Sequence, residues 1–313
     1  MSSSPDTLVV GTRGSLLART QTQWTIDRLQ QAHPRLDIRM EIIRTTGDKL
    51  QSRPLPEIGG KGLFTAELEE ALMAGTIDLA VHSAKDLPTE LREGLTSLAC
   101  PPREDPRDAW ISADGRPFMK LPPGGLVGTS SLRRQAQLLI HRPDLTFIGL
   151  RGNVDTRIRK VKEGQCAGAV LAMAGLNRAN LARHVTEVFD PSFCLPAPGQ
   201  GALALEGRGD DPRVADLLVP IHDASTAAAV EVERAILAAL DAGCRAPVAV
   251  YAAWEGNVIY CEALVANPTG TRVIRSTAEE KDATLFSRLV DRIVVDLKSQ
   301  GAADIIAECR AGE

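Results

Sequence analysis

The first two hundred residues alternate short β-branched and apolar runs with amphipathic stretches, and this rhythm is the strongest constraint on the fold. Such alternation is typical of βαβ units, in which a helix connects two parallel strands. The expected strands are 7–11, 37–44, 77–82, 126–128, 145–150, 167–172 and 201–206, and the expected helices are 15–31, 64–74, 132–142 and 154–163. The pattern therefore predicts an α/β fold with parallel sheets.

The C-terminal hundred residues follow a different pattern. A long helix over 224–240 precedes three strands in meander spacing, at 248–253, 258–266 and 272–276, and a closing helix over 283–300. Strands in meander spacing pair antiparallel, so this order predicts a separate α+β domain with a three-stranded antiparallel sheet.

Two stretches rich in proline and glycine, 101–106 and 195–201, flank one complete α/β set. Because these residues break regular elements, we expect the chain to leave one doubly wound lobe, build a second, and return. The expected domains are 1–101 with 201–220, 102–200, and 221–313. Two linkers between two lobes form a hinge, and the cleft between the lobes is the default ligand site.

The segment 45–62 has six glycines and prolines and no periodicity. A loop of this length in a compact domain is usually a lid or a binding loop. We expect it to cover the cleft.

Composition excludes several classes of protein. With 44% hydrophobic and 24% charged residues the chain is globular rather than disordered, and its net charge of −4 argues against nucleic-acid binding. No apolar run reaches bilayer length, and the N-terminus has no signal pattern, so we expect neither a membrane partner nor export. Six cysteines without metal-type spacing argue against zinc or disulfides and fit a reducing cytoplasm. No heptad or long apolar edge indicates assembly, so we expect a monomer.

Only 8 of the 36 basic residues are lysines, which leaves 28 arginines. GC-rich coding explains part of this excess, but arginine is also the side chain that binds carboxylates and phosphates through two parallel hydrogen bonds. The positions of the arginines decide between these explanations.

Two similar turns, 11–15 and 128–134, each close a strand and open a helix, with Ser15 or Ser131 at the helix start and arginine adjacent. Exposed N–H groups and the helix dipole make such a turn an anion site. Simple N-capping explains either turn alone, but the repetition favours anion binding.

Further arginines follow predicted strand ends. In an open α/β sheet, ligands bind outside the carboxyl ends of the strands, so these side chains should converge on one cleft. The candidates are Arg13, Arg133, Arg134, Arg151, Arg157 and Arg178. They indicate a polyanionic ligand, most simply a polycarboxylate, and the absence of a Walker A or GxGxxG motif disfavours nucleotide.

Asp86 and its neighbour Lys85 follow the strand 77–82. Asp86 is either a simple turn former or a carboxylate that stabilises a cation in the cleft or exchanges protons with a nitrogen leaving group. His82 is expected to be a strand residue with its polar tip satisfied locally. Cys244, in a loop after the long helix, is either an inert small hydrophobe or a covalent attachment point.

Ten short motifs occur in one order along the chain. They are GTRxS at 11–15, TTGD at 45–48, GGKGLF at 59–64, VHSxKDLP at 81–88, EDPRDA at 104–109, GTSSLRR at 128–134, LRGN at 150–153, PGQGA at 198–202, ERA at 233–235 and GC at 243–244. Together they resemble the porphobilinogen deaminase (hydroxymethylbilane synthase) family over nearly the whole chain.

The resemblance implies a transferase that condenses four porphobilinogen molecules into linear hydroxymethylbilane and releases ammonia at each step. It implies a dipyrromethane cofactor on Cys244, and Asp86, helped by Lys85, as the carboxylate that steadies the azafulvenium cation. The implied cofactor-binding residues are Lys61, Ser83, Asp86, Thr129, Ser131, Arg133, Arg134, Arg151 and Gln200, with Asp48 a further cleft position. The implied substrate-binding residues are Arg13, Ser15, Arg151, Arg157 and Arg178.

Two positions depart from the family pattern. Ala242 stands where a second glycine usually precedes the cysteine, and Asp155 stands near Arg157 where a neutral residue is common. The alternative is a two-lobed solute-binding protein of the type II periplasmic class with a polycarboxylate ligand. Such a protein would need an export signal and would have little use for Cys244.

Overall fold

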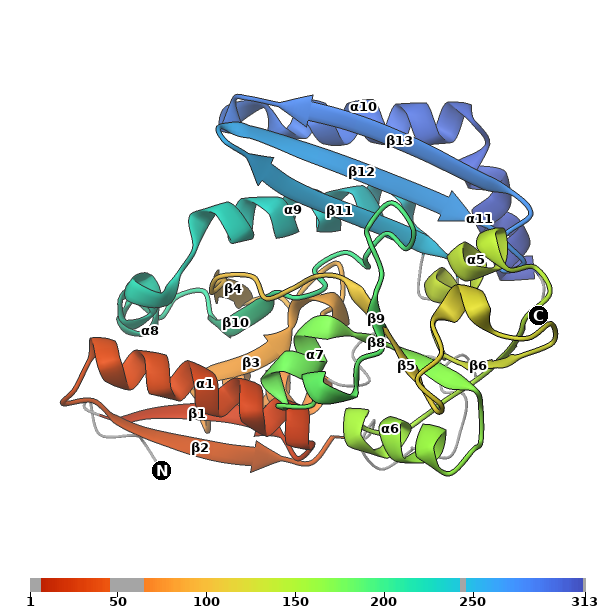
Figure 1. The fold of residues 1–313 in the computed structure, drawn as a ribbon. Helices are drawn as coiled ribbons and strands as arrows, with labels where there is room; N and C mark the ends of the chain where they lie inside the picture. Colours follow the sequence, from red (N-terminus) through yellow and green to blue (C-terminus); the bar gives the residue numbers. More distant parts are fainter. Residues whose placement is uncertain (1–6, 46–64, 243–245, 312–313) are drawn as a thin grey trace. The chain divides into compact units, whose positions relative to one another are not determined.

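The computed structural model describes residues 7–45, 65–242 and 246–311. The contacts divide the chain into two compact units: Met1–Glu104 with Ala202–Ala227, and Asp105–Gly201 with Ala228–Glu313. Figure 1 shows the three sheets and the helices that cover them. None of the described helices is both long enough and apolar enough to cross a membrane. The division into three domains stays a prediction.

The first unit contains a five-stranded sheet in the order β2-β1-β3-β10-β4. Its strands are β1 (Thr7–Arg13), β2 (Asp37–Ile43), β3 (Leu79–Ser83), β4 (Leu95–Ala99) and β10 (Leu203–Arg208), and its helices are α1 (Leu16–Ala32), α4 (Ala66–Met73) and α8 (Pro212–Leu218). Strand β1 is parallel to β2 and β3, whereas β10 is antiparallel to β3 and β4. Alternate residues of β1 face opposite sides: Leu8 and Val10 pack with α1, and Val9 packs with α4.

The second unit contains a sheet with the same pattern, in the order β7-β6-β8-β5-β9. Its strands are β5 (Asp108–Ser112), β6 (Leu126–Gly128), β7 (Thr146–Ile148), β8 (Gly168–Ala172) and β9 (Glu187–Val188), and its helices are α5 (Leu132–His141), α6 (Val154–Lys162) and α7 (Met173–Arg178). Strand β6 is parallel to β7 and β8, and β5 is antiparallel to β8 and β9. The expected parallel sheets are therefore parallel over three strands and antiparallel beyond them.

The C-terminal part of the second unit confirms the predicted antiparallel sheet, β11-β12-β13. Its elements are α9 (Ala224–Leu240, whose first four residues belong to the first unit), β11 (Val248–Glu255), β12 (Val258–Ala266), β13 (Val273–Glu280), α10 (Phe286–Ser299) and α11 (Ala302–Ala311). One face of the sheet packs on α9, α10 and α11, which bury Val250 and Ile236 in a shared core. The other face packs on Ala136 of α5 and on Leu195. Helix α5 is thus held between its own sheet and the C-terminal one.

Close packing explains the glycines that open the two repeated turns. A Cβ at Gly11 would lie 2.4 Å from Cδ1 of Ile77, and one at Gly128 would lie 2.9 Å from Cδ2 of Leu150. Neither glycine has a positive φ, so the requirement is for space rather than for backbone freedom. In both units the middle one of the three parallel strands can therefore pack closely against its neighbours near its carboxyl end, before the helix that follows it.

Candidate functional site

The carboxyl ends of three parallel strands form one edge of the second unit's first sheet. Because β7, β6 and β8 are adjacent and parallel, the residues that follow them lie at the same edge. Helix α5 follows β6, Arg151 follows β7, and α7 with Arg178 follows β8. Strand β5 runs antiparallel to β8, with Asp108 opposite Ala172, so Asp108 begins at this edge too. Arg133, Arg134, Arg151 and Arg178 thus lie in one unit, after strands that end at the same edge.

Local hydrogen bonds start helix α5 at this edge. Oγ of Ser131 accepts from the backbone N–H of Arg134 at 3.4 Å, and Oγ1 of Thr129 accepts from the N–H of Ser131 at 3.2 Å. Ser131 is thereby confirmed as the N-cap, which satisfies an N–H group that the first turn leaves without an intrahelical partner. The first turn carries Arg133 and Arg134.

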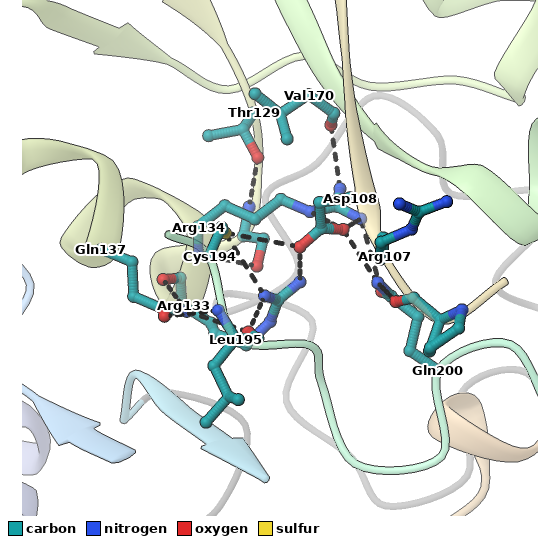
Figure 2. A network of polar contacts seen from close by, with 12 residues as sticks. Arg107, Asp108, Thr129, Arg133, Arg134, Gln137, Val170, Cys194, Leu195 and Gln200 are labelled. Carbon is teal, nitrogen blue, oxygen red and sulfur yellow. Dashed lines mark hydrogen bonds and ion pairs between the residues drawn. The ribbon is translucent and has the colours of Figure 1, made fainter. Parts of the chain in front are cut away.

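Both of these arginines are buried against one carboxylate, that of Asp108 (Figure 2). Nη2 of Arg133 lies 2.7 Å from Oδ2 of Asp108, and Nε and Nη2 of Arg134 donate to Oδ1 at 2.9 and 2.7 Å. The side chains of Arg133 and Arg134 are 6% and 7% exposed and that of Asp108 is fully buried. Desolvation makes such a cluster costly unless each charge is paired and hydrogen-bonded, as it is here.

The two arginines set the ionisation of Asp108. Burial by itself would raise the pKa of this carboxyl group, but the attraction of Arg133 and Arg134 and the hydrogen bonds from Arg134 and Gln200 lower it well below its ordinary value. The carboxylate is therefore ionised at neutral pH. Cys194 shows the opposite effect: burial, followed by the charge of Asp108, raises the pKa of its thiol to about 12. The thiol thus stays protonated and donates to Oδ2 of Asp108 at 3.5 Å.

Backbone carbonyls and amide side chains complete the cluster. Arg133 donates to the carbonyl of Leu195 at 2.5 Å, and Arg134 donates to that of Val170 at 2.9 Å. Gln137 binds both backbone groups of Leu195, at 2.7 and 3.0 Å. These contacts fix the direction of both guanidinium groups.

Gln200 also belongs to this cluster. Its Nε2 donates to Oδ1 of Asp108 at 2.9 Å and to the carbonyl of Pro106 at 2.6 Å, and its Oε1 accepts from Arg134 at 3.5 Å. Of the residues predicted as cofactor-binding, Arg133, Arg134 and Gln200 thus contact Asp108, and Thr129 and Ser131 hold the start of the helix that carries the two arginines.

The charge balance of the cluster shows what it can bind. Two guanidinium cations face one carboxylate, so the Arg133–Arg134–Asp108 group carries one net positive charge. The remaining N–H groups of two planar guanidiniums suit a second carboxylate or a phosphate, which arginine binds through paired hydrogen bonds. The cluster thus has one positive charge more than Asp108 neutralises, and an acidic ligand at this edge would balance it.

The other predicted arginines of this unit, Arg151, Arg157 and Arg178, are half-buried, and backbone carbonyls orient the side chains of the last two. Nε of Arg157 donates to Gly152 at 2.8 Å, and Nη2 of Arg178 donates to Gly201 at 2.7 Å. The carbonyl of Arg151 accepts from Nζ of Lys160 at 3.0 Å. Asp155, the unusual acidic residue, is exposed in the first turn of α6.

The first unit places its predicted residues at the equivalent sheet edge. Ser15, two residues after Arg13 at the end of β1, is the N-cap of α1 and accepts from the N–H of Ala18 at 3.2 Å. The adjacent parallel strand β3 ends at Ser83, whose hydroxyl exchanges hydrogen bonds with Gln21 at 3.1 and 3.4 Å. Here too the predicted N-cap is confirmed.

Lys85 and Asp86 follow β3 in a single 3₁₀ turn, Ala84–Asp86, and both side chains are exposed. The turn is held by a hydrogen bond from the N–H of Ala84 to the carbonyl of Ala202 at 3.0 Å. The carboxylate of Asp86 is therefore presented to solvent from a fixed backbone. His82, three residues before Lys85, lies on β3 as expected and is buried, and its Nε2 lies 2.9 Å from Oε2 of the buried Glu206. Neither atom makes a hydrogen bond of good geometry among the described residues, so the structure does not confirm that the polar tip of His82 is satisfied locally.

Three predicted residues, Asp48, Lys61 and Cys244, lie outside the described residues, as does nearly all of the predicted lid 45–62. Their roles stay predictions. The expectation that the arginines of both lobes converge on one cleft is likewise a prediction.

Sequence reasoning missed Asp108 as a functional residue. It lies in the EDPRDA motif at 104–109, and its position two residues after a proline is the only local signal. Gln137 and Cys194 were missed as well, since their partners are distant in the sequence.

Comparison with known proteins identifies the family. Residues 8–216 match the family model "Porphobilinogen deaminase, dipyromethane cofactor binding domain", and residues 227–290 match "Porphobilinogen deaminase, C-terminal domain". The porphobilinogen deaminase of Syntrophotalea carbinolica is 48% identical over 305 residues, which cover 94% of this chain and 97% of the relative. That of Desulforudis audaxviator is also 48% identical over 305 residues, covering 97% and 98%.

Similarity to solved structures is much weaker. The alkanesulfonate-binding protein SsuA from Xanthomonas axonopodis pv. citri gives a TM-score of 0.39 at 13% identity, with coverage of 99% and 95%, a level at which neither fold nor ligand can be transferred. The family matches do not favour the alternative of a solute-binding protein. They span both units and nearly the full length of the relatives, and the first match is to the dipyrromethane-binding domain. The chain therefore belongs to the porphobilinogen deaminase family.

Proposed function

We propose that this protein polymerises four porphobilinogen molecules into linear hydroxymethylbilane, with release of one ammonia per unit, in tetrapyrrole biosynthesis. Family membership supports the polymerisation of porphobilinogen. The finer steps are argued below from the residues of this chain.

The observation that carries the proposal is the Arg133–Arg134–Asp108 cluster with its net positive charge. Every pyrrole unit of the substrate and of the growing product carries two carboxylates, so the enzyme needs several cationic positions. Arg151, Arg157 and Arg178 belong to the same unit as the cluster, and two of them follow strands that end at the same sheet edge. A binding surface of this kind suits a chain of acidic rings.

The same residues fit the dipyrromethane cofactor of the family. When bound, this group supplies the primer to which substrate units are added, and we propose that a thioether joins it to Cys244. Its carboxylates would be held by Arg133 and Arg134, with Thr129, Ser131, Arg151 and Gln200 as further partners. Lys61 and Ser83 are proposed to bind it as well. A covalent tether makes each addition effectively intramolecular.

We assign the acid–base and electrostatic role to Asp86. Its exposed carboxylate can take a position beside the positive charge that develops on porphobilinogen as ammonia leaves, and can exchange a proton with the leaving nitrogen. Lys85, exposed on the same turn, adds a hydrogen-bond donor. Arg13 and the N-terminus of α1 behind Ser15 are proposed to bind substrate carboxylates.

The proposed function is tested by adding porphobilinogen to the purified protein. We expect consumption of the substrate, release of one ammonia for each porphobilinogen consumed, and hydroxymethylbilane as the product. A protein that binds porphobilinogen without consuming it would instead be a binding protein, and the proposed function would be wrong. Monomeric state, cytoplasmic location and the absence of nucleic-acid or membrane partners stay predictions.

Replacing Arg151 with alanine is expected to raise the KM for porphobilinogen about 10- to 100-fold, the effect of losing a hydrogen bond between charged groups. The backbone of this residue is held by Lys160, so the fold should not change. Arg159→Ala is the matched control, because the side chain of Arg159 is 69% exposed on α6 and forms an ion pair with the exposed Glu163. Steady-state kinetics check the prediction, and wild-type kinetics in Arg151→Ala would remove this residue from the site.

A further inference from the structure

Glu233, in the middle of α9, is a fully buried carboxylate outside the arginine cluster. Its Oε2 accepts from the backbone N–H of Gly199 at 2.6 Å, and its Oε1 accepts from the backbone N–H of Ala252 at 2.8 Å. Hydrogen bonds with an ionised acceptor are about twice as strong as neutral ones. One side chain therefore joins two segments that are more than fifty residues apart in the sequence.

The first of these segments is the turn that carries Gln200. It is closed by a hydrogen bond from the N–H of Gln200 to the carbonyl of Ala197 at 2.9 Å, and Gly199 and Gly201 adopt positive φ angles of 71° and 90°. Gly199 directly precedes Gln200, whose side chain binds Asp108. A shift of this turn would move the amide away from the carboxylate.

The second segment is β11 of the C-terminal sheet, whose opposite face packs on α5. The β12–β13 hairpin also contacts this helix: Gln135 donates to the carbonyl of Pro268 at 3.4 Å, and a Cβ on Gly270 would lie 2.3 Å from the carbonyl of Ala136. Helix α5 carries Arg133 and Arg134. Glu233 thus links the Gln200 turn to the sheet that supports the arginine helix.

We propose that Glu233 is a positioning residue for the arginine cluster. Its hydrogen bonds to Gly199 and Ala252 keep the side chain of Gln200 in contact with Asp108, and so keep Asp108 in place beside Arg134. Glu233 acts on the arginines through a chain of contacts. It holds the backbone of Gly199, the next residue Gln200 binds Asp108, and Asp108 pairs with both arginines. The role needs a carboxylate, because both of its oxygens accept from backbone N–H groups. A glutamine can accept with only one of its two terminal atoms, so Glu233→Gln must release one segment.

Alkylation of Cys194 reports on this role without any assumption about activity. Cys194 precedes the turn, is fully buried and contacts Asp108, whereas Cys166 is buried in the core of the same lobe around α6 and β8. A buried thiol reacts only when its surroundings open. Local loosening of the turn should expose Cys194 alone, while general destabilisation should expose both thiols.

The experiment compares wild type, Glu233→Gln and Glu231→Gln, in which an exposed carboxylate of the same helix is changed. Iodoacetamide labelling of the folded proteins is followed by peptide mass spectrometry. We expect Glu233→Gln to raise the labelling rate of Cys194 relative to Cys166 about tenfold, the effect of losing a hydrogen bond to a charged group. Glu231→Gln should leave this ratio unchanged. An unchanged ratio in Glu233→Gln, or equal acceleration at both thiols, would overturn the proposal.

Kinetics give a second readout, which rests on the proposed function. If Glu233 acts through Gln200, the double variant Glu233→Gln/Gln200→Ala should lose no more kcat/KM than the worse single variant, whereas independent residues give multiplied losses. Multiplied losses would contradict the route through Gln200. If wild type and Glu231→Gln both fail to consume porphobilinogen, the proposed function fails, and the labelling ratio alone decides the role of Glu233.

Discussion

Asp86→Asn is expected to fold like the wild type and to lose about 10²- to 10⁴-fold in turnover, the usual contribution of a positioned acid–base group. Asparagine keeps the size of the side chain but can neither stabilise a cation with a full negative charge nor exchange a proton. The carboxylate is exposed on a single turn whose backbone is held by Ala202, so the substitution should change stability little.

Glu93→Gln provides the matched control for this prediction. Glu93 is an exposed carboxylate in the same unit, in the connection between β3 and β4, and has no assigned role. We expect its turnover of porphobilinogen to equal that of the wild type, and thermal unfolding should show that both variants are folded. Near-normal turnover in Asp86→Asn would show that Asp86 takes no part in the reaction.

Asp108→Ala is expected to destabilise the fold by about 3–5 kcal/mol, because removal of one partner leaves buried charges without their counter-ion. Here two guanidinium groups are left, those of Arg133 and Arg134. Urea unfolding at neutral pH measures the loss. Asp105→Ala is the control, since Asp105 is only partly buried and pairs with the exposed Arg107. A change in Asp108→Ala no larger than in this control would show that the cluster is not held by Asp108.

The same carboxylate predicts a dependence of stability on pH. The pKa of Asp108 is lower in the folded protein than in the unfolded chain, so the unfolded state binds the proton more readily. The stabilising contribution of the Asp108 carboxylate is therefore complete above its pKa in the unfolded chain, about 4. It is lost as the pH falls below that value toward the lower pKa that Asp108 has in the folded protein. The difference in free energy of unfolding between wild type and Asp108→Asn should shrink below about pH 4. A difference that does not change with pH would contradict this.

Local patterns in the sequence predicted much of the fold. Strands β6 and β12 and helix α9 have the predicted bounds, because turn residues or helix caps border them in the sequence. The N-caps Ser15 and Ser131 were also predicted correctly, since a cap depends on residues within one turn. Helix α11 was missed because the amphipathic pattern weakens after Gly301, which separates it from α10 with a φ of 97°.

Long-range pairing accounts for most of what the sequence did not predict. Strands β4, β5 and β9 are short, and each is fixed by antiparallel partners that lie far away in the chain, as β5 is by β8. The same limit applies to the site. The arginines at 133 and 134 were predicted as ligand-binding from their turn, but their common partner Asp108 is at least 25 residues away, and its place after a proline does not indicate what it contacts. Side-chain direction, unlike capping, depends on tertiary contacts.

The central claim is that a dipyrromethane group, attached to one thiol of the protein, is lengthened by pyrrole units while arginine side chains bind its carboxylates. The most direct test is the intact mass of the purified protein, compared with Cys244→Ala and with Cys309→Ala as a cysteine control. We predict that the wild type and Cys309→Ala exceed the polypeptide mass by two pyrrole units, and that Cys244→Ala has the bare mass and no activity. A bare polypeptide mass in an active wild-type preparation would contradict the claim.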